Sequence, residues 1–145
     1  MPSTRMMALT ALTALAAMLA GTAAFAQETG RLTAELNKLE QGEGTACRAF
    51  FLFRNATGRT MEAFEMSLAV LDARGVIDQL VTVDAAPLPV DRTTLKLFEF
   101  PDVRCDGISD LLLHEVGACR PQNGEDMDCF AILDLASKAD AGLVK

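Results

Sequence analysis

Residues 27–145 of this 145-residue chain are predicted to form an antiparallel β-sandwich of about seven strands, and three observations predict it. Apolar and polar side chains alternate with a period of two, which is typical of strands with one buried face. Turn-forming clusters recur about every ten residues. Apart from residues 108–116, which fit either state, no useful length carries apolar residues at helical spacing. The sequence therefore predicts the all-β class.

The first two pairs of predicted strands are the clearest. Residues 32–37 alternate apolar and polar side chains and so have one wet face, whereas residues 47–53 are apolar on both faces, which predicts a central strand. Residues 64–70 alternate again and lead into Asp72–Gly75, a turn signal whose glycine supplies the left-handed residue of a hairpin. Residues 76–83 form the returning strand.

The second half of the chain is predicted to hold three more strands. Prolines at 87–89 rule out regular pairing and mark a loop that crosses between sheets. Strands are then expected at residues 93–100, 108–118 and 130–135, separated by proline-containing turns. Residues 137–145 are expected to be a loosely held tail or a short edge strand.

The first 26 residues have the three parts of a secretory signal peptide. Arg5 is the only early charge, residues 6–20 are apolar, and Ala24–Ala26 ends in the small residues of a peptidase site. We therefore expect Sec-type export, cleavage after Ala26 and a periplasmic or secreted product. Residues 1–26 are then the signal peptide and residues 27–145 a single domain with no membrane insertion.

The charge of the chain excludes one class of partner. The leader contains Arg5 and no acidic residue, so its removal changes the formal charge from −7 to −8. Such an acidic protein repels phosphate backbones, and we expect no nucleic-acid partner.

Four cysteines follow the leader, and none lies in a Cys-x-x-Cys pair. In an exported chain this pattern predicts two structural disulfides, for which three connectivities exist. In a seven-strand sandwich the second and sixth strands run the same way in facing sheets. Cys47 begins the second and Cys105 precedes the sixth, so we expect these two to bond. Cys119 and Cys129 would then close the loop before the last strand.

No catalytic constellation is recognisable in the sequence. His114 is the only histidine, and no nucleophile turn such as G-x-S-x-G accompanies it. We therefore expect no enzymatic activity, no cofactor and no catalytic residue. Alternation along residues 108–118 puts His114 on the face of Leu112 and Val116, which predicts a partly buried side chain with its hydrogen bonds satisfied.

Metal binding in the periplasm is the alternative function. Imidazole and thioether groups suit copper(I), which makes His114 with Met61, Met66 or Met127 one candidate set. The acids of residues 125–128 are a candidate for calcium, although their spacing is not that of an EF-hand. Core methionines and a solvated acidic loop are the simpler explanations, so no residue is assigned as a metal ligand.

Residues 51–100 resemble a known layout. A strand ends in Arg54-Asn55-Ala56-Thr57-Gly58, and an Asp-x-x-Gly-x-hydrophobic hairpin follows at residues 72–77. This is similar to the immunoglobulin-like domains of bacterial envelope proteins. The Asn-Ala-Thr triplet also matches a glycosylation acceptor, but we interpret it as turn chemistry.

The whole mature chain resembles small four-cysteine exported proteins of alphaproteobacteria that have no assigned activity. Residues 36–40, 47–50 and 53–55 carry that likeness. The resemblance implies an immunoglobulin-like sandwich and no catalytic residue. The sequence therefore predicts a non-enzymatic periplasmic binding module, stabilised by two disulfides, whose partner is another envelope protein or a small ligand.

Overall fold

The computed structural model of the protein describes residues 30–145, so the predicted leader and its cleavage site lie outside the described residues. Strands make up most of this part of the chain, which has no α-helix and one 3₁₀ turn. The elements are β1 (Leu32–Gln41), β2 (Cys47–Asn55), β3 (Met61–Leu71), β4 (Ile77–Asp84), β5 (Thr93–Phe100), η1 (Cys105–Gly107), β6 (Asp110–Pro121), β7 (Leu133–Ser137) and β8 (Gly142–Val144).

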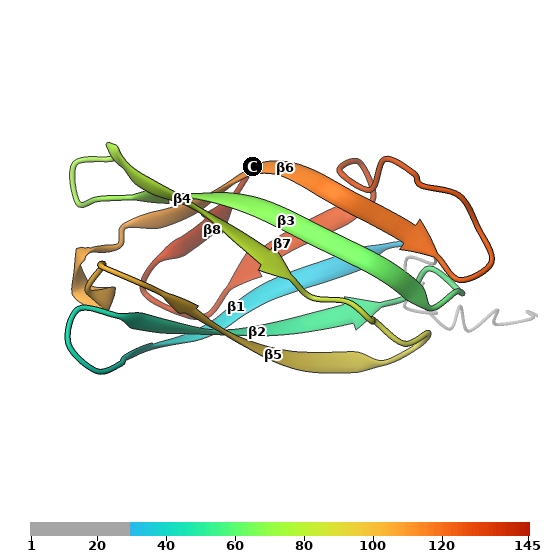
Figure 1. Ribbon diagram of the computed structural model, residues 1–145, viewed down its shortest axis with the longest axis horizontal. Helices are drawn as coiled ribbons and strands as arrows, with labels where there is room; N and C mark the ends of the chain where they lie inside the picture. The colour runs from blue at the N-terminus through green and yellow to red at the C-terminus, as the bar shows by residue number, and fades with distance from the viewer. Residues whose placement is uncertain (1–29) are drawn as a thin grey trace, which may run out of the picture.

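The strands form two sheets of four, which pack as the two layers of a β-sandwich (Figure 1). The first sheet has the strand order β5-β2-β1-β7, and the second has the order β4-β3-β6-β8. In the lettering of immunoglobulin domains, β1 to β6 occupy the places of A, B, C, C′, E and F. The predicted all-β sandwich is confirmed.

The two sheets are mixed rather than purely antiparallel, and the described residues form eight strands rather than about seven. β7 runs parallel to β1, and β8 runs parallel to β6, whereas all other pairs are antiparallel. After β6 the chain crosses to the first sheet for β7 and returns to the second for β8. These two strands contact each other and close one side of the sandwich.

The observed strand bounds differ from the predicted ones by up to four residues. β5 spans residues 93–100 as expected, and the segment that also fitted a helix lies in a strand. β7 begins three residues later than predicted, because the chain turns after Cys129, where the Ile132 amide donates to the Cys129 carbonyl at 3.2 Å. The final segment adopts the second of its two expected states, the edge strand β8.

The core lies between the inner faces of the two sheets, and aromatic rings from β2 dominate its middle. The Phe51 and Phe53 rings stack with centroids 5.8 Å apart, and Phe64 of β3 meets Phe53 edge to face at 5.9 Å. These separations are typical of favourable aromatic pairs. The predicted central position of β2 is therefore confirmed, since β1 and β5 flank it.

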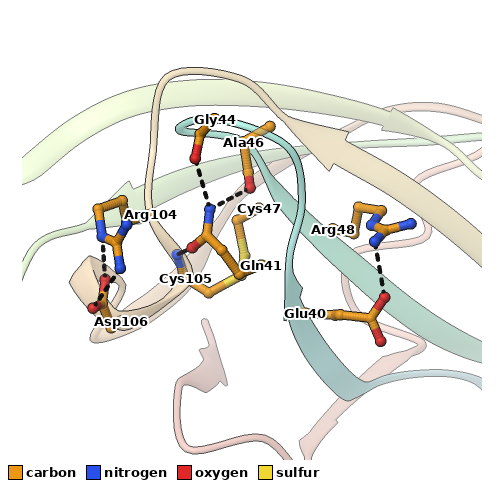
Figure 2. The surroundings of a disulfide bond; sticks show 9 residues. All are labelled: Glu40, Gln41, Gly44, Ala46, Cys47, Arg48, Arg104, Cys105 and Asp106. Atoms are coloured by element: carbon orange, nitrogen blue, oxygen red, sulfur yellow. Dashed lines mark hydrogen bonds and ion pairs between the residues drawn. A yellow bond between two sulfur atoms is a disulfide. The ribbon is translucent and has the colours of Figure 1, made fainter.

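Both disulfides have the expected pairing, and no cysteine within residues 30–145 is free. Cys47 at the start of β2 bonds to Cys105 in η1, which joins the first sheet to the turn that enters β6 (Figure 2). The Gln41 side chain supports this bridge, because its oxygen accepts the Cys105 amide at 3.1 Å while its nitrogen donates to the Ala46 carbonyl at 2.8 Å. Cys119 of β6 bonds to Cys129 across the following loop.

Candidate binding surfaces

Exposed apolar side chains gather on the outer faces of both sheets. On the second sheet the register aligns Leu80 of β4, Ala69 of β3, Leu112 of β6 and Val144 of β8 in one row across all four strands. Leu80 is 60% exposed, whereas Ala69, flanked by the two leucines, is almost completely covered. Ile77, 58% exposed, lies beside this row at the next outward position of β4. We call Ile77, Leu80, Leu112 and Val144 the β4 face.

The same outer surface becomes acidic further along the strands. Glu65 of β3 pairs in register with Asp84 of β4. Two residues further along β3, Ser67 pairs with Glu115 of β6. Within residues 30–145 none of these three carboxylates forms an ion pair. An apolar row beside uncompensated negative charge is complementary to a partner that offers apolar and basic side chains.

The first sheet carries a second apolar surface. Its register places Leu97 of β5 next to Phe50 of β2, and Leu95 next to Leu52. Leu95 and Leu97 are 60% and 51% exposed, and the two β2 side chains are half-buried. We call these four residues the β2–β5 face.

β4 and β5 are edge strands on the side of the sandwich opposite to β7 and β8. Lys96 of β5 points inward rather than outward, and its ammonium donates to the Ala86 carbonyl at 3.2 Å. Gln79 of β4 spans the same side by donating to the Pro101 carbonyl at 2.9 Å. An inward-pointing charge on an edge strand disfavours pairing with the edge of another chain. The faces, rather than the edges, are therefore the surfaces suited to binding.

His114 lies elsewhere than predicted. The register of β3 and β6 shifts between Leu113 and Glu115, so His114 is an extra residue of a bulge with no partner on β3. Its side chain is exposed rather than partly buried. Simple alternation fails here because a bulge changes which face the following residues occupy.

The structure assembles neither the acidic set nor a site of His114 with the buried methionines. Met61 and Met66 are buried in the core, which keeps their sulfur atoms away from the exposed His114. In the acidic loop, one carboxylate oxygen of Asp128 accepts the Phe130 amide at 2.9 Å. Residues 30–145 contain no group of three or more histidine, cysteine, aspartate or glutamate side chains placed to hold a metal ion.

Asn55 at the end of β2 is the one buried polar residue in this part of the chain, and its side chain holds two loops, the one after β2 and the one after β4. Its amide nitrogen donates to the Arg59 and Leu88 carbonyls, both at 2.8 Å. Its oxygen accepts the Thr57 amide at 3.0 Å and the Thr57 hydroxyl at 2.7 Å. Turn chemistry therefore explains the Asn-Ala-Thr triplet. No local pattern in the sequence indicates that Asn55 also holds the loop after β4.

An open hollow of about 440 Å³ lies next to Asn55, between the ends of β1, β2 and β7. The Arg31 guanidinium and the Asp134 carboxylate meet in it through two hydrogen bonds. These bonds hold the pKa of Asp134 below its usual range. Because Thr33 of β1 pairs with Asp134, the ion pair reinforces the parallel β1–β7 contact. The arrangement is explained by the fold without a ligand.

Comparisons with known proteins identify the fold and no family. No protein-family model matches the chain, and no curated protein sequence does. Among solved structures, the chain is similar to IrmA from Escherichia coli, with a TM-score of 0.55 and 14% identity over 72% of this chain and 90% of that one. Identity this low supports a shared fold alone. The resemblance to four-cysteine exported proteins stays a prediction.

Two observations bear on the environment of the protein. The two disulfides are compatible with an oxidising, extracytoplasmic location. Among the described residues, no helix has the length and apolar character needed to cross a membrane.

Proposed function

We propose that the protein is a non-enzymatic binding module of the bacterial periplasm, and that another envelope protein docks on its β4 face. One observation carries this proposal, namely the row of apolar side chains that crosses the whole second sheet on its solvent side. Single exposed apolar residues are common on proteins, but contiguous patches with a polar rim are typical of interaction sites.

The chemistry beside the row narrows the class of partner. Asp84, Glu65 and Glu115 have no compensating ion pair in residues 30–145, so a partner that brings lysine or arginine next to its apolar contacts gains electrostatic attraction. A partner that placed acidic side chains opposite these three carboxylates would be repelled. The predicted signal peptide and the two disulfides support a periplasmic setting for this encounter.

Affinity capture with matched baits tests the proposal. The wild-type protein, Leu80→Glu and Glu115→Lys are compared as baits in periplasmic extract. Val90→Glu is the control, because it adds one charge to an exposed apolar position outside both faces. We expect that wild type and Val90→Glu capture the same partner protein, and that Leu80→Glu and Glu115→Lys do not capture it.

The purified partner is then titrated against the same four proteins. Leu80→Glu is expected to weaken binding by at least about tenfold, which is about 1.4 kcal/mol, because it would bury an unpaired charge in the apolar contact. A partner that binds wild type and Leu80→Glu equally would refute a role for the β4 face.

A further inference from the structure

β5 contributes two apolar side chains to the β2–β5 face, although its other outward side chains are polar. Thr93 and Glu99 occupy the first and last outward positions of β5, and Leu95 and Leu97 lie between them. These leucines are more than half exposed, although Phe98 and Phe100 on the inner side of β5 already supply its core contacts. The fold itself does not require two leucines at these outward positions.

Charges of opposite sign lie side by side at one end of this face. Arg48 of β2 is directly in register with Glu99 of β5. Arg48 donates from one terminal nitrogen to Glu40 at 3.0 Å (Figure 2), whereas Glu99 forms no ion pair within residues 30–145. The Arg48 Nε is buried and has no hydrogen-bond partner in the same part of the chain. At the other end, Arg54 of β2 pairs with Thr93.

Two copies of the β2–β5 face have complementary side chains when one particular twofold axis relates them. If the axis runs parallel to the strands, midway between β2 and β5, then β2 of each copy lies over β5 of the other. The leucines then meet Phe50 and Leu52, and Arg48 of each copy lies opposite Glu99 of the second copy. An axis across the strands would instead place Arg48 opposite Arg54 of the second copy. Only the first arrangement pairs opposite charges.

We propose that the protein forms a homodimer in which the two β2–β5 faces pack against each other about the axis parallel to the strands. Aligned packing of two sheets through apolar side chains is a common arrangement. Because β5 is an edge strand, β1 of the second copy lies beyond that edge and faces no further strand of this sheet. The dimer leaves both β4 faces exposed, so it extends the proposed function and does not depend on it.

Sedimentation velocity of the mature, oxidised protein over a concentration series tests the proposal. We expect a concentration-dependent dimer for wild type and a monomer for Leu97→Lys, because this variant would bury one unpaired positive charge from each subunit in the apolar middle of the interface. Leu80→Glu is the control on the opposite sheet and is expected to dimerise like wild type. A wild-type protein that stays monomeric up to about 1 mM, the weak end of specific association, would overturn the proposal.

Charge reversal tests the orientation of the two copies. Arg48→Glu and Glu99→Arg each place like charges opposite each other in a homodimer, and each is expected to weaken dimerisation at least about tenfold. When the two variants are mixed, both contacts in the mixed dimer join opposite charges, and dimerisation is expected to return. Mixing changes no intramolecular contact, so recovery reports the interface alone. A mixture that stays monomeric while wild type dimerises would refute the assigned axis.

Discussion

Replacing Asn55 by alanine is expected to destabilise the protein by about 2–3 kcal/mol. The side chain is 1% exposed and makes four hydrogen bonds. At about 1 kcal/mol each, their loss amounts to about 4 kcal/mol. The cost is smaller because both carbonyls have another donor in the variant. The Thr57 hydroxyl, released from Asn55, can donate to Arg59, and the Met61 amide already donates to Leu88.

Asn55→Asp is expected to be worse than alanine at neutral pH. It keeps the shape of the side chain and the acceptor for Thr57, but it turns an oxygen toward the two carbonyls that the amide nitrogen now contacts. Burial raises the pKa of the introduced carboxyl in the folded state above its unfolded value. The folded state therefore binds the proton more tightly, and this variant gains stability as the pH falls toward the unfolded pKa.

Equilibrium unfolding in urea, with both disulfides oxidised, measures these differences. Wild type, Asn55→Ala and Asn55→Asp are compared at pH 7 and pH 4, and the slope against urea is checked for two-state behaviour. Thr57→Val serves as a control that removes the hydroxyl bonds and leaves the two carbonyl contacts of Asn55 in place. A cost below about 0.5 kcal/mol for Asn55→Ala, the range of ordinary surface substitutions, would contradict the role assigned to this side chain.

Three further predictions concern covalent and local structure. Loop entropy for sequence separations of 58 and 10 gives about 4 kcal/mol for the Cys47–Cys105 bridge and about 3 kcal/mol for Cys119–Cys129. Replacing both cysteines of the first bridge by alanine should therefore lower the free energy of unfolding more than the same change in the second bridge. A larger loss for the second bridge would contradict the loop-entropy account. Hydrogen bonding, chiefly from the Val76 amide, holds the pKa of Asp72 in the folded state below its ordinary value. The stabilisation that Asp72 contributes is present above its unfolded pKa and is lost as the pH falls through its folded pKa. The difference in Tm between wild type and Asp72→Ala should therefore narrow from pH 6 to pH 2, and a constant difference would refute this. Gly75 has a φ of 74°, and a Cβ atom added there would meet open space. Gly75→Ala should therefore lower the free energy of unfolding in urea by about 1 kcal/mol through backbone strain alone, and Gly75→Asn should lower it less. Equal losses for the two variants would argue against backbone strain as the cause.

Most strands could be predicted because their buried faces follow a period of two, as in β3 and β5. The directions of β7 and β8 could not, since alternation is the same in parallel and antiparallel strands. The exposed position of His114 escaped prediction for a related reason. Nothing local marks the extra residue that the bulge inserts into β6.

The binding surfaces were predictable only in outline, as a sheet face or a loop. In β5 one side of the strand carries Leu95 and Leu97, and the other carries Lys96 and Phe98. Alternation alone does not decide which side is buried, because Lys96 lies on one side and Glu99 on the other. Pairing with β2 decides it, since it puts Phe100 opposite the buried Cys47 and so turns Lys96 inward. Which apolar residues remain outside depends on register between distant strands, and that information is not local.

The order of the disulfides along the chain has a consequence for biogenesis. Each cysteine bonds to its neighbour in sequence, Cys47 to Cys105 and then Cys119 to Cys129. A chain that crosses a membrane with its N-terminus first presents these thiols in the same order. An oxidant that joins each new thiol to the one still waiting therefore produces both native bridges directly. If the protein is exported as its sequence predicts, its maturation is expected to need a thiol oxidase but no disulfide isomerase.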